Sequence, residues 1–399
     1  MSHVFRMAVI RHICTGLLFL VLLACDQPQP IGDDERYQAY PGLPYSLMAT
    51  LIGNGEAGRS AFGIEPLETR LYQPQDVTIG PDGRPYILDW NNHRILVLNN
   101  HRVESFLGTG ELGPGLPGPA NEISLDHPTH ISFDSRGRMV ISTWHNSRIL
   151  RYDSGTGRVE SIAGTGERGY SGDGGPATEA MLNLPVATAI DASGRMFISD
   201  QANQSIRVVG TDGIIRRYAG NGKQGFSGDG GPATEARLYA PVGQGAQPTG
   251  RIALDAAGNL YIADTYNHRI RKVDTNGIIT TIAGSGSIGL GAGGHAGDEG
   301  AAASSVLSSP SDVAVDSEGN LFIADTGNHC VRRVDVNGII TTLIGQAQEP
   351  GFAGDADHPR WSKMRGPTGI GFDEHDNLFI TDTFNHRLRV AYKGIIRLE

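Results

Sequence analysis

Residues 263–270 read Ala-Asp-Thr-Tyr-Asn-His-Arg-Ile, and the chain carries this pattern six times. The other five copies begin at residues 88, 142, 199, 324 and 381. Successive copies are 54, 57, 64, 61 and 57 residues apart, so the repeating unit has about 59 residues. Six units of that size need about 350 residues, and residues 45–399 supply 355. The repeat therefore accounts for all of 45–399 as one domain.

Each unit predicts four short antiparallel strands. In the fifth unit, residues 312–316 alternate as a strand, and a turn leads to a second strand over 321–324. The Asp-x-x-Asn turn at 325–328 precedes a third strand over 331–335. Asn337-Gly338 then turns the chain into a fourth strand over 339–344, because both residues tolerate a positive φ. Radial repetition of four-stranded sheets is the plan of a β-propeller.

The Asp-x-x-Asn-His-Arg stretch, with Asn-Gly-Ile-Ile behind it, resembles the NHL repeat. The resemblance covers 45–399 and implies an all-β fold, a six-bladed β-propeller of four-stranded antiparallel blades. The pattern weakens in the second copy, where Thr143 and Ser147 replace Asp and His. It weakens again in the third, where Gln204 and Ser205 replace His-Arg.

The two ends of the domain predict how the ring closes. The chain finishes in 393–398, which supplies only the start of an outermost strand. Residues 46–53, near the other end, alternate like the rest of such a strand. We therefore expect this N-terminal strand to pair with the last blade and close the ring.

Residues 1–24 predict a secretory signal. Arg6 and Arg11 precede an apolar run over 17–23 that is too short to span a bilayer. The run ends in Leu22-Leu23-Ala24-Cys25, which resembles the bacterial lipobox. That resemblance implies cleavage before Cys25, lipidation of Cys25 and an exported, lipid-anchored protein of the bacterial cell envelope, in the inner or the outer membrane. Residues 25–44 have the polar, proline-containing composition of a tether.

Charge and composition exclude several classes of protein. The chain has 33 Lys and Arg against 43 Asp and Glu and shows no basic stripe, so we expect no nucleic-acid partner. Of its three cysteines, two lie at 14 and 25 and Cys330 stands alone, so no intrachain disulfide is predicted. The 55 glycines and 21 prolines interrupt the sequence too often for a helix bundle.

Most repeated polar residues are predicted to be structural. Asp and Asn side chains bond nearby backbone N–H groups, so the Asp-x-x-Asn turn needs them whether or not a ligand exists. The repeated histidines are expected to pack against a neighbouring turn. The segment at 172–180, Gly-Asp-Gly-Gly-Pro-Ala-Thr-Glu-Ala, recurs at 228–236 and is interpreted as a turn followed by one helical turn.

Aromatic residues break the repeat in four blades. They stand one or two positions after the turn Asp, near the long segments that connect successive blades. Turns do not require aromatic side chains, whereas exposed aromatic surfaces suit sugars and peptides. The predicted binding residues on this loop-rich face are Trp90, Trp144, His145, Tyr266 and Phe384.

A second departure from the repeat lies two residues after the proline that opens each unit. We take these prolines to be residues 74, 128, 185, 248, 310 and 367. The residues two positions later then include Asp76, His130 and Asp312, which we expect at the mouth of the central channel. The alternative hypothesis is a divalent metal ion there, since Asp and His ligate such ions. Gluconolactonase-like hydrolases and peptide-amidating lyases are six-bladed relatives with an axial metal, but their flanking motifs are not recognisable here.

The leading functional hypothesis is a binding module without chemistry of its own, and no cofactor is predicted for it. It would take a protein, peptide or glycan on the loop-rich face and contact the membrane through its lipid anchor. The alternatives are a metal-dependent hydrolase or lyase centred on the channel mouth and a structural scaffold of an envelope assembly. Fold alone does not choose among them, because propellers serve binding and catalysis alike.

Overall fold

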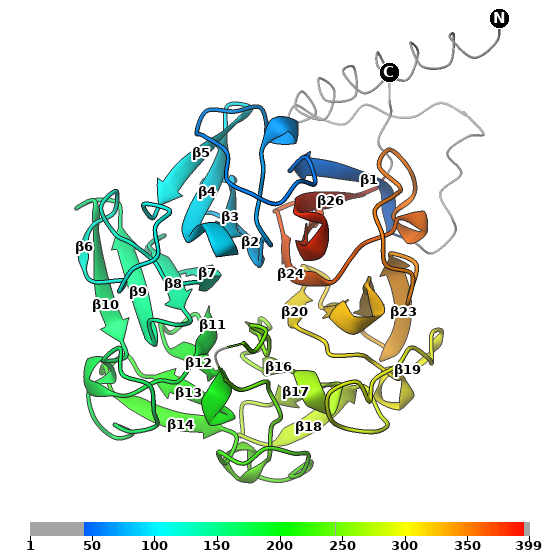
Figure 1. Ribbon diagram of the computed structural model, residues 1–399. Coiled ribbons are helices and arrows are strands. Elements are labelled where there is room, and N and C mark those ends of the chain that lie inside the picture. The colour runs from blue at the N-terminus through cyan, green and yellow to red at the C-terminus, as the bar shows by residue number, and fades with distance from the viewer. Residues whose placement is uncertain (1–43, 244, 395–399) are drawn as a thin grey trace, which may run out of the picture.

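The computed structural model describes residues 44–243 and 245–394 and shows the predicted propeller (Figure 1). The predicted signal segment, Cys25 and the tether up to residue 43 lie outside the described residues. Within the described part, no helix is long and apolar enough to cross a membrane.

Six antiparallel sheets form the ring, each ordered from the centre outward. The first blade consists of β2 (Asp76–Ile79), β3 (Pro85–Asp89), β4 (Arg94–Asn99) and β5 (Arg102–Leu107). The second consists of β7 (Pro128–Phe133), β8 (Met139–Thr143), β9 (Arg148–Asp153), β10 (Arg158–Ala163) and the short outer β6 (Gly118–Pro119). The third consists of β11 (Pro185–Ile190), β12 (Met196–Asp200), β13 (Ser205–Val209) and β14 (Ile215–Ala219).

The remaining three blades repeat the same order. The fourth blade consists of β15 (Ile252–Leu254), β16 (Leu260–Asp264), β17 (Arg269–Val273) and β18 (Ile279–Ala283). The fifth consists of β20 (Asp312–Val315), β21 (Leu321–Asp325), β22 (Cys330–Val334), β23 (Ile339–Ile344) and the short outer β19 (Gly300–Ala301). The sixth consists of β24 (Pro367–Phe372), β25 (Leu378–Asp382), β26 (Arg387–Lys393) and β1 (Tyr45–Ile52).

Strand β1 confirms the predicted closure. It is the outermost strand of the sixth blade and runs antiparallel to β26, with Met48 opposite Ala391 and Thr50 opposite Arg389. Figure 1 shows β1, in blue, beside β26, in red. Strands from the two ends of the domain thus share one sheet, which ties the ring together through backbone hydrogen bonds.

Single-turn 3-10 helices occupy two recurring places. One group forms the turn between the second and third strands of five blades: η3 (Trp90–Asn92), η5 (Gln201–Asn203), η7 (Thr265–Asn267), η9 (Thr326–Asn328) and η11 (Thr383–Asn385). The other group lies in the crossovers, the segments that join one blade to the next: η2 (Pro66–Glu68), η4 (Ala177–Glu179), η6 (Ala233–Glu235), η8 (Ala302–Ser304) and η10 (Pro359–Trp361). The helical turn predicted after Gly-Asp-Gly-Gly-Pro is confirmed as η4 and η6.

The crossovers also cover the outer edges of the blades. In the crossover to the third blade, the Gly174 N–H bonds the Ile215 carbonyl at 2.8 Å, and the Ala177 N–H bonds the Gly213 carbonyl at 3.0 Å. An outermost strand otherwise exposes a row of unpaired backbone groups. The crossover therefore protects that edge while it carries the chain back to the centre.

Buried arginines fasten the crossovers to blades three to six. Arg207, for example, is wholly buried, 2.7 Å from the crossover residue Asp173 and 3.7 Å from the turn residue Asp200. The same arrangement joins Arg271 to Asp229 and Asp264, Arg332 to Asp298 and Asp325, and Arg389 to Asp355 and Asp382. Leu96 and Leu150 stand at the corresponding positions of blades one and two. In blade one the buried Arg94 instead lies 2.8 Å from the turn residue Asp89 and donates to the crossover carbonyl of Ser60 at 3.1 Å.

Candidate functional site

The repeated histidines join neighbouring blades, as expected of structural residues. Each Nδ1 accepts a hydrogen bond from a backbone N–H at the end of the next crossover, just before a proline. The donors to His93, His268, His329 and His386 are His127, Ser309, Gly366 and Gln73, at 3.3, 2.9, 3.1 and 3.1 Å. Gln204 replaces the histidine in blade three, and its Oε1 accepts from the Ala240 N–H at 2.7 Å.

The turn Asp and Asn are structural as well. In all six blades the Asn side-chain amide donates to a glycine carbonyl of the preceding crossover, at 2.6–2.9 Å. In five blades the turn Asp accepts from an N–H near the crossover's end, as Asp89 does from Tyr72 at 2.7 Å. In blade two, which has Thr143 instead, Asn146 accepts the corresponding bond from the Asp126 N–H at 3.0 Å.

The predicted channel residues join neighbouring blades from the inside. Asp76 accepts from the Ile131 N–H at 2.9 Å, and Asp312 accepts from the Ile370 N–H at 3.0 Å. His130 Nδ1 lies 3.4 Å from the Thr188 backbone nitrogen, which donates to it. Each of these three donors belongs to the innermost strand of the next blade. The three side chains therefore have a structural role as interblade contacts.

The fourth blade corrects the sequence-based alignment of this inner ring. Tyr239-Ala240-Pro241 makes the contacts of a crossover end, so Pro241, not Pro248, is the equivalent proline, and residues up to 249 are an insertion. Strand pairing then places Arg251, not Gly250, level with Asp76 and Asp312. The error arose because the insertion ends in a second proline.

Arg251 occupies the centre of this ring of residues. Its guanidinium is wholly buried and donates to the carbonyls of Gln75 and Thr129, at 2.8 and 3.0 Å, and to that of Thr368. It also lies 3.8 Å from Asp312. Burial raises the pKa of the Asp312 carboxyl to about 7, with Arg251 acting in the opposite direction. A fixed positive charge beside the proposed ligands disfavours a metal ion there.

The aromatic residues do not form the exposed surface that we expected. Trp90 and Trp144 are 8% and 1% exposed and belong to a hydrophobic cluster that continues into blades three and four. Tyr266 and Phe384 are half-buried, and the Tyr266 ring packs edge-on against Tyr239 at 5.4 Å. Of the five predicted binding residues, Trp90, Trp144 and His145 thus contact one another, whereas Tyr266 and Phe384 lie in other blades.

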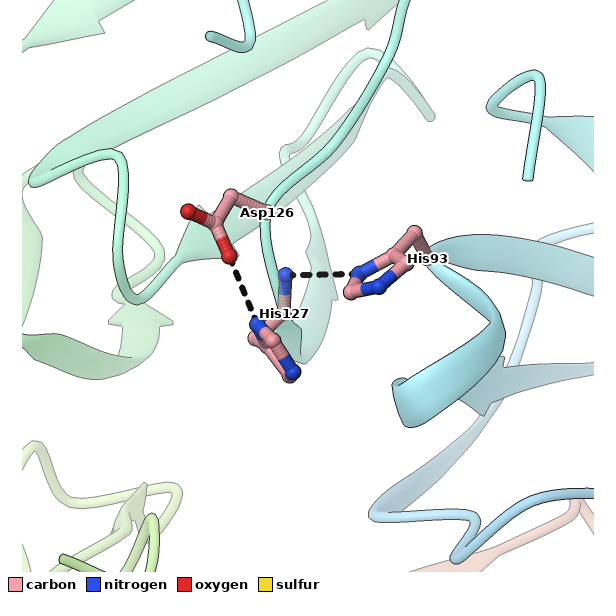
Figure 2. A group of neighbouring side chains, drawn as sticks. All are labelled: His93, Asp126 and His127. Atoms are coloured by element: carbon pink, nitrogen blue, oxygen red, sulfur yellow. Dashed lines mark hydrogen bonds and ion pairs between the residues drawn. The ribbon is translucent and has the colours of Figure 1, made fainter. Parts of the chain in front are cut away.

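The junction of blades one and two contains the most distinctive group of polar side chains. His93 ends the η3 turn of blade one, whereas Asp126 and His127 end the crossover into blade two. Figure 2 shows the His93 ring beside the backbone nitrogen of His127 and the His127 ring beside Asp126. One potential ligand atom from each of these three residues lies within 4.8 Å of the other two. We call His93, Asp126, His127 and the adjoining His145 the histidine cluster.

Asp126 organises the cluster. Its Oδ1 lies 2.6 Å from Nδ1 of His127 and 3.2 Å from Nδ1 of His145. Burial alone would raise the pKa of Asp126, but the hydrogen bonds from His127 and His145 hold this pKa well below its usual range. An ionised carboxylate only accepts, so the Nδ1 atoms of His127 and His145 are the donors in these two contacts. The Nε2 atom of His145 is buried without a hydrogen-bond partner.

Aromatic rings enclose the histidine cluster. The His127 ring lies 4.5 Å from His93, 4.7 Å from His145 and 4.9 Å from Trp90 between centroids. The Trp144 ring stacks on His145 at 4.5 Å. Burial, followed by the charge of His127, lowers the pKa of His93 to about 4. The cluster thus brings three half-buried imidazoles and one half-buried carboxylate together beside two indole rings.

The sequence pattern did not indicate His93, Asp126 and His127 as candidate site residues. The available signal was the end of the crossover: Asp126-His127-Pro128 stands where the other units have Tyr-Gln-Pro, Asn-Leu-Pro, Tyr-Ala-Pro, Ser-Ser-Pro or Arg-Gly-Pro. The Asp126 carboxylate lies within hydrogen-bond distance of the His127 and His145 rings, whereas the bond that the turn Asp accepts in the other blades goes to Asn146 here.

Comparisons with known proteins place these blades in a family. The teneurin NHL domain matches residues 46–227, 219–292 and 289–350. Teneurin-1 of Gallus gallus is 24% identical over 88% of this chain, and NHL repeat-containing protein 2 of Bos taurus is 25% identical over 67%. The chain spans only 14% and 40% of the lengths of these two relatives.

A solved structure agrees with this fold. An auxiliary nutrient binding protein of Bacteroides ovatus has a TM-score of 0.60 and 14% identity, with 88% of this chain and 78% of that one covered. Such a likeness shows the propeller fold alone. Because the family match extends through most of the repeated blades, the chain belongs to the teneurin NHL domain family.

Proposed function

We propose that this protein is an exported, lipid-anchored binding module that takes a protein, peptide or glycan on its crossovers. The observation that carries the proposal is the distribution of exposed large apolar side chains. Ten of the twelve in the described residues lie on crossovers: Phe62, Leu67, Tyr72, Leu112, Leu116, Val242, Ile288, Leu290, Phe352 and Trp361. Because only two of these twelve side chains lie on strands or hairpins, the distribution favours the crossovers as the interaction region.

Not all of these side chains are equally free to bind. Phe352 packs under Arg387, with 3.8 Å between the guanidinium and the ring, and Phe62 packs in the same way under Arg94. Leu112, Leu116 and Leu290 are more exposed, at 61%, 54% and 77%. We expect these leucines to contribute more to partner contact than the phenylalanines, whose faces are already partly covered.

The scaffold supports such a role. The crossovers into blades five and six, for example, are held both by a histidine contact at their end and by a buried arginine, so their tips are presented on a rigid ring. A protein of the same fold is named as an auxiliary nutrient binding protein, which shows that this fold can serve binding. The ligand that we assign to this chain, a protein, peptide or glycan, is part of the proposal and does not come from that protein's name.

Introducing a charge on the crossovers tests the binding surface. Leu116→Glu and Leu290→Glu are expected to weaken partner binding at least tenfold, because each places a charge in an apolar contact. Val336→Glu is the matched control, since Val336 is 69% exposed but lies in a hairpin on the opposite side of the blade. If all three variants are folded and bind the partner equally well, the crossovers are not the binding surface.

The lipid anchor is a separate part of the proposal, and it rests on the 22–25 motif. Cys25→Ser is expected to move the protein from the detergent phase to the aqueous phase in phase partitioning. Wild-type protein that already partitions into the aqueous phase would contradict the anchor. This test leaves the binding surface untouched.

A further inference from the structure

We propose that the histidine cluster binds a divalent transition-metal ion of the Zn²⁺ class. The ligand atoms would come from His93, Asp126 and His127, with His145 beside them. The proposal does not rest on the binding role of the crossovers, because it concerns a different set of side chains at the junction of blades one and two.

The geometry of the cluster carries the proposal. Zn²⁺ binds imidazole nitrogen and carboxylate oxygen at about 2.0–2.2 Å, which separates neighbouring ligands by about 3.3 Å in a tetrahedral site. Asp126 Oδ1 lies 2.6 and 3.2 Å from the Nδ1 atoms of His127 and His145. Potential ligand atoms of His93, Asp126 and His127 all lie within 4.8 Å of one another. Small side-chain rotations would therefore complete a ligand set.

The donor types select the class of ion. Imidazoles with one carboxylate suit Zn²⁺, Cu²⁺ or Ni²⁺, whereas Ca²⁺ and Mg²⁺ prefer oxygen ligands. The side chains of Asp126, His127 and His145 are 22%, 20% and 13% exposed, so an ion has access from solvent. The channel residues offer no comparable set, because Arg251 lies among them.

An ion would replace hydrogen bonds that the cluster makes among its own residues. The contact of His93 with the His127 N–H is 3.3 Å, longer than the 2.9–3.1 Å of the other three repeated histidines. Its loss therefore costs the fold less than at other junctions. An ion at Nδ1 of His127 requires the ring proton to move to Nε2, a change of tautomer with no change of charge.

The buried indole N–H groups of Trp90 and Trp144 show that this junction is built differently from the others. Neither Nε1 has a hydrogen-bond partner, although both rings are more than nine-tenths buried. Buried donors without partners are rare and costly. The two indoles hold the imidazoles of His127 and His145 in place by ring contact, which preorganises the cluster.

The test measures Zn²⁺ binding to the full-length chain, after chelator treatment, by calorimetry and elemental analysis. We expect one ion per chain and at least a tenfold loss of affinity in His127→Gln and in Asp126→Asn. His329→Gln, which alters the equivalent contact of blade five, and His130→Gln, at the channel, are matched controls that retain the wild-type affinity.

A second measurement needs no variant of the cluster. The chain has three tryptophans, two of which contact the cluster, while Trp361 lies in a crossover. In a Trp361→Phe background, Cu²⁺ is expected to quench the remaining fluorescence at one equivalent, and EDTA is expected to reverse the quenching. The absence of stoichiometric binding overturns the proposal, and so does full affinity in folded His127→Gln and Asp126→Asn. A loss confined to His130→Gln would assign the ion to the channel and overturn it too.

Discussion

Nδ1 of His386, in the last blade, accepts a hydrogen bond at 3.1 Å from the backbone N–H of Gln73, in the crossover that enters the first. The two residues are 313 positions apart in the chain. The same histidine contact links consecutive blades elsewhere in the ring, so the ring closes by repeating its own interblade bond. Together with the pairing of β1 and β26, it joins the two ends of the domain.

Removing this contact should destabilise the closed ring. His386→Ala leaves the half-buried Gln73 N–H without its acceptor, and we expect a loss of about 1 kcal/mol of unfolding free energy, the lower end of the cost of an unpaired donor. His386→Gln should cost less, because Gln204 makes the equivalent contact in blade three. Urea unfolding checks both variants. Equal stability of the alanine variant and the wild type would show that the contact contributes nothing.

The histidine contacts should make the fold sensitive to acid. Burial lowers the pKa of His268, His329 and His386, and lowers that of His93 to about 4. Protons therefore bind the unfolded state more tightly. The stabilisation is fully present above about pH 6.5, the unfolded pKa, and decreases as the pH falls toward the folded pKa.

The His386→Gln variant isolates this effect. Burial raises the pKa of carboxyls such as Asp325 to about 7, and these groups act in the opposite sense, but the variant and the wild type share them. Between pH 7 and pH 5 the wild type should lose more unfolding free energy than His386→Gln. A difference in unfolding free energy between the two proteins that stays constant with pH would contradict a role of the His386 contact in the acid sensitivity.

The buried arginines should be essential to blades three to six. Arg332→Ala leaves the buried Asp325 carboxylate and Asp298 without their cation, and breaking a buried pair costs about 3–5 kcal/mol. Arg216→Ala is a suitable control, because Arg216 pairs with Asp212 at the surface. Urea unfolding should separate the two variants clearly. Similar midpoints for both would contradict the structural role of Arg332.

Trp144 should contribute to stability rather than to partner contact. Trp144→Ala removes a ring that is only 1% exposed, and truncations of this kind cost about 3–5 kcal/mol. At a temperature where the variant remains folded, its affinity for a partner should equal that of the wild type. A selective loss of affinity with unchanged stability would restore Trp144 to the binding surface.

The repeat predicted the blades, their strand order and the closing strand, because each depends on spacing and alternation along the chain. It also predicted the structural use of Asp, Asn and His, since these occur in nearly every unit. Arg251 could not be placed correctly, because an insertion between Pro241 and Pro248 shifts the apparent register.

The histidine cluster could not be assembled from sequence for a different reason. His93 and His127 belong to different units, and their proximity depends on the angle between blades. The burial of Trp90 and Trp144 likewise depends on the direction in which each turn points its first side chain, which a residue pattern does not encode. Interactions within a unit were predictable, whereas those between units required the structure.

The central claim, that the crossovers form the binding surface, is tested most directly by site-specific photo-crosslinking in intact cells. A diazirine amino acid would replace Leu290 or Leu116 on the crossovers, or Val336 in the opposite hairpin as a control of comparable exposure. We predict a light-dependent adduct of one defined mass at positions 290 and 116 but not at 336. An adduct confined to 336, or equal labelling at all three positions, would contradict the account.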